Sequence, residues 1–278
     1  MDLNQQTKST MAVKCNVFNM DCREYLASPF CPDFDFAFFD PPFNIGQDYN
    51  GFNDRMGNSE YRDLLSDTMR LAWLRLKPGA AMYWHGSVEV SFEFIRVIDR
   101  LELTDAVERK LIWGFNFGQN QYNNFTNTHA EIFVLRKPGI RKFYFENVKI
   151  PSKRLLQGDK RTETAKHGGF VTPGSIWGLQ TNDQNVVVEP IECEYKWGRV
   201  VGNSPERRQG HPNQLPEVYI QRAIAANTAP LDLVFDGFAG SGTTGVVATA
   251  LGRNSILTDI SPWNCDSIIQ RLEIGAML

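Results

Sequence analysis

The sequence predicts an α/β fold built on a doubly wound, mostly parallel sheet. Short apolar runs alternate with segments of helical periodicity, which is the pattern of strand–helix–strand units. The glycine-rich segment 238–245 follows one such run and opens a helical stretch, as nucleotide-binding turns do. Only 33 residues follow Gly245. Most strands must therefore precede it, and the nucleotide-binding half is predicted to be permuted to the C-terminus.

Seven strand candidates follow one another along the chain. Each is a short run rich in apolar, β-branched or aromatic residues. They span residues 13–18, 34–39, 80–84, 110–113, 131–135, 231–235 and 255–258. We expect the fourth and fifth, which are joined by a long connection rich in Asn, Gly and Gln, to form a hairpin at the edge of the sheet.

Helices are predicted between the strands from capping signals and apolar spacing. Ser59 caps the first, whose apolar residues recur at i, i+3 and i+4 until the segment 77–79 ends it. Ser87 begins the second. Pro216 suits the first turn of another, which runs to about Asn227. Two more helices flank the last strand.

Length and composition fit one enzyme domain with an insertion. The chain has 278 residues, a formal net charge of −3 and no Ser/Pro-rich linker. We divide it into a polar N-terminal tail (1–12), a first half of the sheet domain (13–138), an inserted region (139–209) and a cofactor-binding half (210–278). The inserted region has weak periodicity and collects glycines, prolines and charges.

Membrane and metal functions are not indicated. No apolar run approaches the length of a membrane span and the first ten residues are polar, so we expect a soluble, cytoplasmic protein. The five cysteines form no CxxC pair, which argues against a disulfide framework and a structural zinc site. We therefore expect no metal.

Positive charge is concentrated around the start of the inserted region. Ten Lys and Arg residues lie between Arg136 and Lys166, against Glu146, Asp159 and Glu163. Such an excess suits phosphate neutralisation by a nucleic-acid-binding protein, but a solvated polar face has the same composition. Charge alone leaves both interpretations open.

Asp40-Pro41-Pro42-Phe43 follows the apolar strand candidate 34–39, at the carboxyl end where such sheets bind ligands. The prolines fix the backbone and remove two N–H donors, which leaves carbonyl oxygens free to accept. A carboxylate, a free carbonyl and an aromatic ring can accept both hydrogens of an exocyclic amine while the ring stacks on the attached base. The alternative is a Pro-Pro turn that closes a strand.

In this order, the two motifs resemble those of the β-class, circularly permuted DNA amino-methyltransferases, which act on adenine N6 or cytosine N4. Asp40 to Phe43 is similar to their catalytic motif, and Phe238 to Thr244 is similar to their S-adenosylmethionine loop. The segment 211–216 also matches the family. The resemblance implies a Rossmann-like, S-adenosylmethionine-dependent methyltransferase fold, with 13–138 as the catalytic half and 139–209 as the target-recognition region.

The resemblance also implies a reaction and residue roles. A methyl group passes from S-adenosylmethionine, the cofactor, to the amine of a base flipped out of double-stranded DNA. Asp40, Pro41, Pro42 and Phe43 form the catalytic set: Asp40 and the Pro41 carbonyl accept the amine hydrogens, and Phe43 stacks on the base. The implied cofactor-binding residues are Asp21, Asp40, Asn213, Gln214, Phe238, Gly240, Ser241, Gly242, Thr243, Thr244 and Asp259.

Within this set, each group has its own place. Gly240 and Gly242 let the backbone approach the ligand, Phe238 lies against it, and the hydroxyl residues meet the methionine portion. Asp259 is placed to bind the ribose hydroxyls; the structural alternative is an aspartate that caps a loop. Asp21 is placed near the adenine amine of the cofactor; the structural alternative is an ordinary turn.

The sequence departs from the family at three positions. Phe43 stands where Tyr is common, Leu215 where a lysine is usual, and Gly237 where proline is frequent. The aromatic ring suffices for stacking, whereas Leu215 removes a charge partner for the cofactor carboxylate. His85 is interpreted as a pocket-wall or internally satisfied histidine.

Other functions remain as alternatives. Asp at the head of the motif favours adenine N6 over cytosine N4, because the cytosine enzymes of this class more often begin with Ser. A glycine-rich fingerprint with Asp259 nineteen residues after Gly240 also fits an NAD-dependent oxidoreductase. Two further alternatives are a catalytically silent nucleic-acid-binding module and a related enzyme that acts on RNA. The family resemblance allows a homodimer and a cognate restriction endonuclease as partners.

Overall fold

The structure is a computed structural model, and it describes most of the chain. The described residues are 13–49, 52–115, 122–178, 180–181, 187–188, 197–202, 204–211 and 213–276. The predicted N-terminal tail therefore lies outside the described residues.

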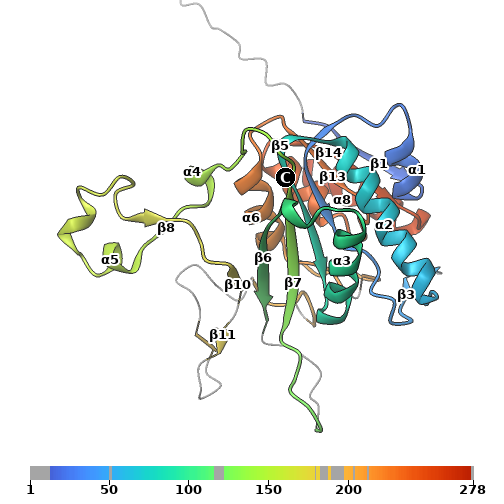
Figure 1. Ribbon diagram of the computed structural model, residues 1–278, viewed down its shortest axis with the longest axis horizontal. Helices are drawn as coiled ribbons and strands as arrows, with labels where there is room; N and C mark the ends of the chain where they lie inside the picture. Colours follow the sequence, from blue (N-terminus) through green and yellow to red (C-terminus); the bar gives the residue numbers. More distant parts are fainter. Residues whose placement is uncertain are drawn as a thin grey trace, which may run out of the picture.

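Eight strands form one sheet in the order β1-β14-β13-β2-β5-β7-β6-β10 (Figure 1). The first five strands in this order, β1, β14, β13, β2 and β5, run parallel to one another. Strand β7 is antiparallel to both β5 and β6, and β10 is parallel to β6. Their bounds are β1 Cys15–Asn19, β14 Asn254–Asp259, β13 Leu233–Asp236, β2 Phe34–Phe39, β5 Leu76–Gly86, β7 His129–Arg136, β6 Val107–Gly114 and β10 Ile176–Gly178. The predicted α/β fold with a mostly parallel sheet is confirmed.

The permuted order appears as a direct pairing of β2 with β13, two strands from opposite ends of the chain. Phe36 pairs with Val234 and Phe38 with Asp236 in parallel register. The carboxyl ends of both strands therefore meet at one edge of the sheet.

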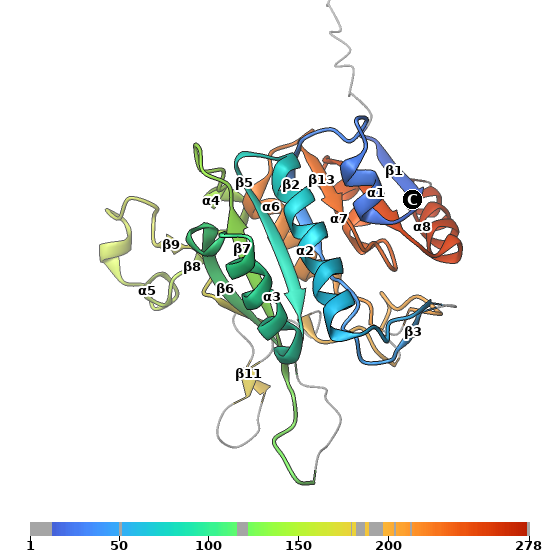
Figure 2. The same cartoon turned by 45° about the vertical axis from the view of Figure 1, so that its right-hand side comes forward.

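Helices cover both faces of the sheet (Figure 2). One face carries α1 (Cys22–Ala27), α2 (Asn58–Arg75) and α3 (Val88–Arg100), and the other carries α6 (Glu217–Asn227) and α7 (Thr243–Ala250). The last helix, α8 (Pro262–Ala276), packs on β1 and β14. From Phe36 to Phe39 the residues of β2 alternate between the two cores, with Ala37 and Phe39 in the first and Phe36 and Phe38 in the second. Phe34, which lies before an irregularity in the pairing with β5, also enters the first core, so the strand is buried on both faces.

The predicted insertion consists of short elements, most of which project from the sheet, whereas β10 belongs to it (Figure 1). They are α4 (Phe145–Val148), β8 (Ile150–Pro151), α5 (Lys153–Leu156), a 3₁₀ turn (Lys160–Thr162), β9 (Phe170–Val171), β10, β11 (Gln180–Thr181) and β12 (Val187–Val188). We name the part from α4 to β9 the projecting lobe, residues 145–171. Elsewhere, β3 (Asp48–Tyr49) pairs with β4 (Phe52–Asn53), and a second 3₁₀ turn spans Thr104–Ala106.

The structure differs from the sequence expectations at several boundaries. Gly57, rather than Ser59, occupies the cap position of α2, and Pro216 caps α6 instead of lying in its first turn. The segment 77–79 belongs to β5, because Leu76 already pairs with Phe34. The β6–β7 hairpin is confirmed but is not the sheet edge, since β10 of the insertion pairs with β6.

No helix of the described residues is both long and apolar enough to span a membrane. Within the same residues, no group of three or more His, Cys, Asp and Glu side chains is arranged to hold a metal ion.

A buried carboxylate ties β2 to the strands and loop around it. Asp35 binds the ammonium groups of Lys77 at 2.8 Å and Lys142 at 2.6 Å, and it accepts the Leu233 N–H of β13 at 3.0 Å. Burial opposes the charged form of Asp35, but the Leu233 N–H and the two lysines outweigh it and lower its pKa. Because the folded pKa lies below the ordinary value, this contribution is present at neutral pH and disappears as the pH falls through the folded pKa.

We expect Asp35→Asn to lower the free energy of unfolding by about 2 kcal/mol at neutral pH, because both lysines lose their partner while volume is kept. Asp63→Asn is the matched control, since its ion pair with Arg100 is exposed on both sides, and should cost no more than about 0.5 kcal/mol. Urea unfolding measures both. Equal effects of the two substitutions would show that Asp35 does not hold the strand pair.

Candidate functional site

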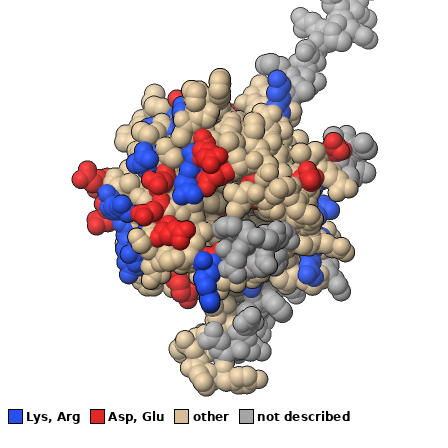
Figure 3. Space-filling model, turned by 90° about the vertical axis from the view of Figure 1, so that its right-hand side faces the viewer, with Lys and Arg blue, Asp and Glu red and all other residues tan. Residues whose placement is uncertain are grey.

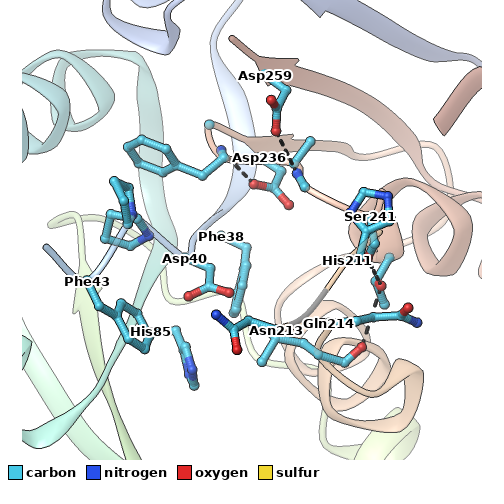
Figure 4. Close-up of a pocket in the computed structure, with 18 of the residues that line it drawn as sticks. Phe38, Asp40, Phe43, His85, His211, Asn213, Gln214, Asp236, Ser241 and Asp259 are labelled. Carbon is cyan, nitrogen blue, oxygen red and sulfur yellow. Dashed lines mark hydrogen bonds between the residues drawn. The ribbon is translucent and has the colours of Figure 1, made fainter. Parts of the chain in front are cut away.

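A cavity of about 490 Å³ opens at the carboxyl ends of β2, β5, β13 and β14. Its size lies within the usual range for small-molecule sites. All the predicted site residues except Gly242 line it. Figure 4 shows Asp40, Phe43 and His85 on one side of the cavity and Ser241, His211 and Asp259 on the other. Two motifs separated by about 200 residues thus form one site.

The Asp40 motif presents two acceptors without partners. The Asp40 carboxylate and the Pro41 carbonyl make no hydrogen bond with any described residue, whereas the Pro42 carbonyl accepts the Tyr61 hydroxyl at 2.8 Å. The Tyr61 bond anchors the second proline to α2. The two free acceptors therefore stand on a fixed backbone in the cavity wall, beside the Phe43 ring.

Two acids of the cavity, Asp40 and Asp236, have raised pKa values. Burial raises the pKa of Asp40 well above its ordinary value, and the nearby Asp236 carboxylate raises it further. Burial also raises the pKa of Asp236 to about 6, although the Thr244 hydroxyl and the Phe238 N–H oppose this. A positive charge bound beside these two acids would favour their ionised forms.

The glycine loop between β13 and α7 is shaped by two left-handed residues. Gly240 has φ of 49° and Gly242 has φ of 75°, a region that side chains disfavour. A β-carbon on Gly240 would meet no neighbour closer than 3.9 Å, so its backbone is accessible, as expected. A β-carbon on Gly242 would lie 2.7 Å from Ile268, so close packing against α8 also requires a glycine here.

Asp259 and Asp21 each make the capping contacts that were weighed as alternatives. Asp259 accepts the Gly240 N–H at 2.8 Å, the Ser261 N–H at 2.9 Å and the Asn264 amide at 3.0 Å. Asp21 caps α1 through the Arg23 N–H at 2.7 Å and forms an ion pair with the Arg23 side chain at 2.6 Å. Both carboxylates are thus held in place at the cavity edge.

The side-chain amide of Gln214 also makes hydrogen bonds within the protein. Its amide donates to the Glu206 carbonyl at 2.7 Å and accepts the Arg208 N–H at 2.9 Å. These bonds close the turn that carries Asn213, whose oxygen lies 3.4 Å from the Arg199 guanidinium. The side chain of Gln214 therefore shapes this wall.

The sequence did not identify several lining residues as site residues. His85, Trp113 and Phe115 line the cavity near the Asp40 motif, and His211 lies on the opposite side with its ring centroid 5.0 Å from that of Trp263. His85 was interpreted from its strand-end position as a pocket-wall or internally satisfied histidine, and it is both, since it lines the cavity and its Nδ1 lies 3.0 Å from the Tyr219 hydroxyl. Trp113 and Phe115 gave no signal, since their place depends on the pairing of β6 with β7.

Comparison with known proteins identifies relatives over most of the chain. The DNA methylase family matches residues 34–270. The DNA adenine methyltransferase YhdJ of Escherichia coli is 25% identical over 248 residues, which cover 87% of this chain and 77% of that protein. The type II methyltransferase M.BglII of Bacillus subtilis is 26% identical over 227 residues, which cover 77% of this chain and 56% of that protein.

Solved structures share the fold at low sequence identity. The crystal structure of the M1.HpyAVI–SAM complex matches with a TM-score of 0.58 and 17% identity, covering 93% of this chain and 98% of that one. The PvuII DNA methyltransferase, described as cytosine-N4-specific, matches with a TM-score of 0.62 and 17% identity, covering 94% of this chain and 86% of that one.

The packing role of Gly242 predicts a difference between two glycines. Gly242 and Gly252 share a φ of 75°, but a β-carbon on Gly252 would meet no atom within 4 Å. We expect Gly242→Ala to destabilise the fold by about 2 kcal/mol more than Gly252→Ala, because only the first overpacks against Ile268. Urea unfolding of the two variants measures this difference. Equal destabilisation would mean that backbone strain alone selects glycine at 242.

Proposed function

The chain belongs to the DNA methylase family, as its motifs predicted, and from that premise we propose that it transfers the methyl group of S-adenosylmethionine to the N6 amine of adenine in double-stranded DNA. The observation that carries the proposal is the pair of free acceptors, the Asp40 carboxylate and the Pro41 carbonyl, in the cavity wall. An exocyclic amine has two hydrogens to donate, which matches this pair.

The two acceptors prepare the amine for attack. The lone pair of an aromatic amine is delocalised into the ring, which makes it a poor nucleophile. Asp40 and Pro41 accept the two N–H groups and thereby favour a pyramidal nitrogen, while Phe43 holds the flipped base by stacking. S-adenosylmethionine, when bound, supplies an electrophilic methyl group on a sulfonium. Its positive charge would oppose the effect of burial on the pKa of Asp40 and so favour the ionised carboxylate.

The opposite side of the cavity is proposed to hold the cofactor. The backbone of the glycine loop, with φ of 49° at Gly240, provides close approach, and Ser241, Thr243 and Thr244 provide polar groups for the methionine portion. Asp259 is proposed for the ribose hydroxyls, and Asp21 for the adenine amine. Phe238 lies against the cofactor, and Asn213 and Gln214 bound the methionine end.

Adenine is proposed over cytosine from the aspartate at the head of the motif. Both chemistries occur among similar proteins, since YhdJ is named a DNA adenine methyltransferase and PvuII methyltransferase is described as cytosine-N4-specific. A cytoplasmic location, a homodimer and a cognate restriction endonuclease stay predictions from the sequence.

The projecting lobe is proposed to be part of the DNA-binding, target-recognition region. Six of the ten cations between 136 and 166 bind protein groups: Arg136, Lys137, Arg141, Lys142, Lys149 and Arg161. The other four are exposed and make no side-chain hydrogen bond or ion pair with the described residues: Lys153, Arg154, Lys160 and Lys166. Of these, Arg154 is near enough to Asp159 to add to the lowering of its pKa by Arg161. All four lie in the lobe, whereas Figure 3 shows both signs of charge intermingled on the face of the molecule that it presents.

The catalytic proposal predicts the effect of Asp40→Asn. The substitution keeps the shape but presents an amide that cannot accept with both atoms, so transfer of labelled methyl to DNA should fall about 100-fold or more. The exposed Asp33→Asn is the matched control and should leave the rate unchanged. Retention of S-adenosylmethionine by both variants excludes misfolding.

Three outcomes would contradict this proposal. Retention of NAD in place of S-adenosylmethionine would favour an oxidoreductase, and cofactor binding without transfer to any DNA would favour a silent binding module. Mass analysis of nucleosides from treated DNA identifies the methylated amine. Detection of N4-methylcytosine in place of N6-methyladenine would show that cytosine is the target base.

The lobe predicts a change in salt dependence. Joint replacement of Lys153, Arg154, Lys160 and Lys166 by Ala should weaken duplex DNA binding and flatten the slope of log affinity against log salt by about 0.9 for each phosphate that is no longer neutralised. A variant lacking the ion-paired Arg70, Arg96 and Arg100 of α2 and α3 is the control. If both variants change the slope equally, the lobe does not bind the phosphates.

A further inference from the structure

Resting on the proposed function, we infer that His85 reads the target base: its Nε2–H donates to the ring nitrogen next to the reacting amine, which is N1 in adenine and N3 in cytosine. His85 is thus a specificity-determining residue that selects bases carrying an amine beside an unprotonated ring nitrogen.

The strand register places His85 beside Asp40. Phe39 of β2 pairs with Trp84 of β5, and both belong to the core on the α2 side. Side chains alternate along strands, so the next residues, Asp40 and His85, both face the α6 side. Neighbouring strands lie about 4.8 Å apart. Both side chains line the cavity, and the His85 ring centroid lies 6.1 Å from that of Phe43 (Figure 4).

A hydrogen bond from α6 sets which nitrogen of His85 carries the proton. His85 Nδ1 lies 3.0 Å from the Tyr219 hydroxyl, and this is the only hydrogen bond of that hydroxyl with the described residues. Tyr219 is fully buried among aromatic rings. An unpaired buried hydroxyl hydrogen costs about 1–3 kcal/mol. Tyr219 therefore donates to Nδ1, and the proton of the neutral imidazole resides on Nε2.

The remaining edge of the ring is available to a ligand. Nε2 makes no hydrogen bond with a described residue. It is also not fully enclosed by protein atoms, so a ligand in the cavity can reach it. Burial lowers the pKa of His85 to about 3, so the ring is neutral at physiological pH. The titratable groups facing it are Asp40, just after β2, and Tyr219 on α6, and burial raises the pKa of each of these.

Asp40 and His85 together form an acceptor next to a donor. The Watson–Crick edge of adenine has the complementary order, with the N6 amine as donor and N1 as acceptor. Cytosine has the same order at N4 and N3. Guanine and thymine carry a carbonyl and a protonated ring nitrogen at these places, so a donor would meet a donor and an acceptor an acceptor. The pair therefore admits amino bases and rejects keto bases.

A cycle of base analogue and variant tests this assignment. The modified site is first located by sequencing DNA methylated by the wild type, and duplexes then carry either adenine or 1-deazaadenine, which has C–H in place of N1, at the target. We expect the wild type to lose about 10-fold in kcat/KM on the analogue, as one neutral donor is left unpaired. His85→Phe, which keeps a ring, should be about 10-fold slower than the wild type on adenine, and its loss on the analogue should be smaller than that of the wild type by about the same factor.

The cycle also separates chemistry from structure. Because the analogue alters the amine itself, only the difference between the two proteins reports the hydrogen bond. His85→Gln, whose amide can donate from a similar distance, should recover most of the sensitivity. Tyr219→Phe removes the control over the imidazole proton and should reduce the sensitivity to N1 without a change in S-adenosylmethionine binding.

The outcomes distinguish this inference from the function on which it rests. An active wild type and a His85→Phe variant that are equally sensitive to the analogue would overturn the role of His85 alone. Loss of S-adenosylmethionine binding by His85→Phe would identify a structural role instead. No transfer to any amine by the wild type would overturn the proposed function and the inference with it. If cytosine is the modified base, 3-deazacytosine replaces the analogue.

Discussion

The site depends on one structural constraint, the parallel pairing of β2 with β13. The register of Phe36 with Val234 and Phe38 with Asp236 places the ends of both strands at the same edge of the sheet. The Asp40 motif leaves one strand and the glycine loop leaves the other, so the base site and the cofactor site share a cavity. Because β2 is buried on both faces, a slip of one residue would exchange its two sets of phenylalanines between the cores. Core packing therefore maintains the alignment that the reaction needs.

The acids of the cavity differ in how far the protein satisfies them, and this separates their roles. Asp259 accepts from three protein donors, and Asp236 from the Phe238 N–H and the Thr244 hydroxyl. Asp40 accepts from none in the described residues. A carboxylate that is partly removed from solvent and has no donors is unfavourable, and the structure maintains the half-buried Asp40 in this state at the point where an amine is proposed to bind. This difference supports the proposed catalytic role of Asp40, whereas the contacts of Asp259 and Asp236 hold the glycine loop in place.

Local rules predicted the elements that local forces determine. The strand at 34–39 and the cap at Ser87 occur as expected, because an apolar run and a side-chain oxygen act over a few residues. The edge strand β10 was missed, since three residues of an irregular region join the sheet only through their pairing with β6. Charge counting also overstated the basic surface, because Arg136 and Lys142 find their partners in distant strands. The motifs predicted which residues meet in the cavity. The other lining residues, such as Trp113 and Phe115, could not be predicted because their positions depend on tertiary packing.

The arrangement of Asp40 and His85 has a consequence for base choice. Adenine and cytosine present the same donor and acceptor to this pair, so the pair separates amino bases from keto bases but not adenine from cytosine. The bases differ in the remainder of the ring, where a purine is larger by a fused imidazole. Discrimination between them must therefore come from shape, and the aromatic walls formed by Phe43, Trp113 and Phe115 are the surfaces that can provide it. Such apolar selection by size is worth only about 1–3 kcal/mol, whereas mismatched buried hydrogen bonds are worth more.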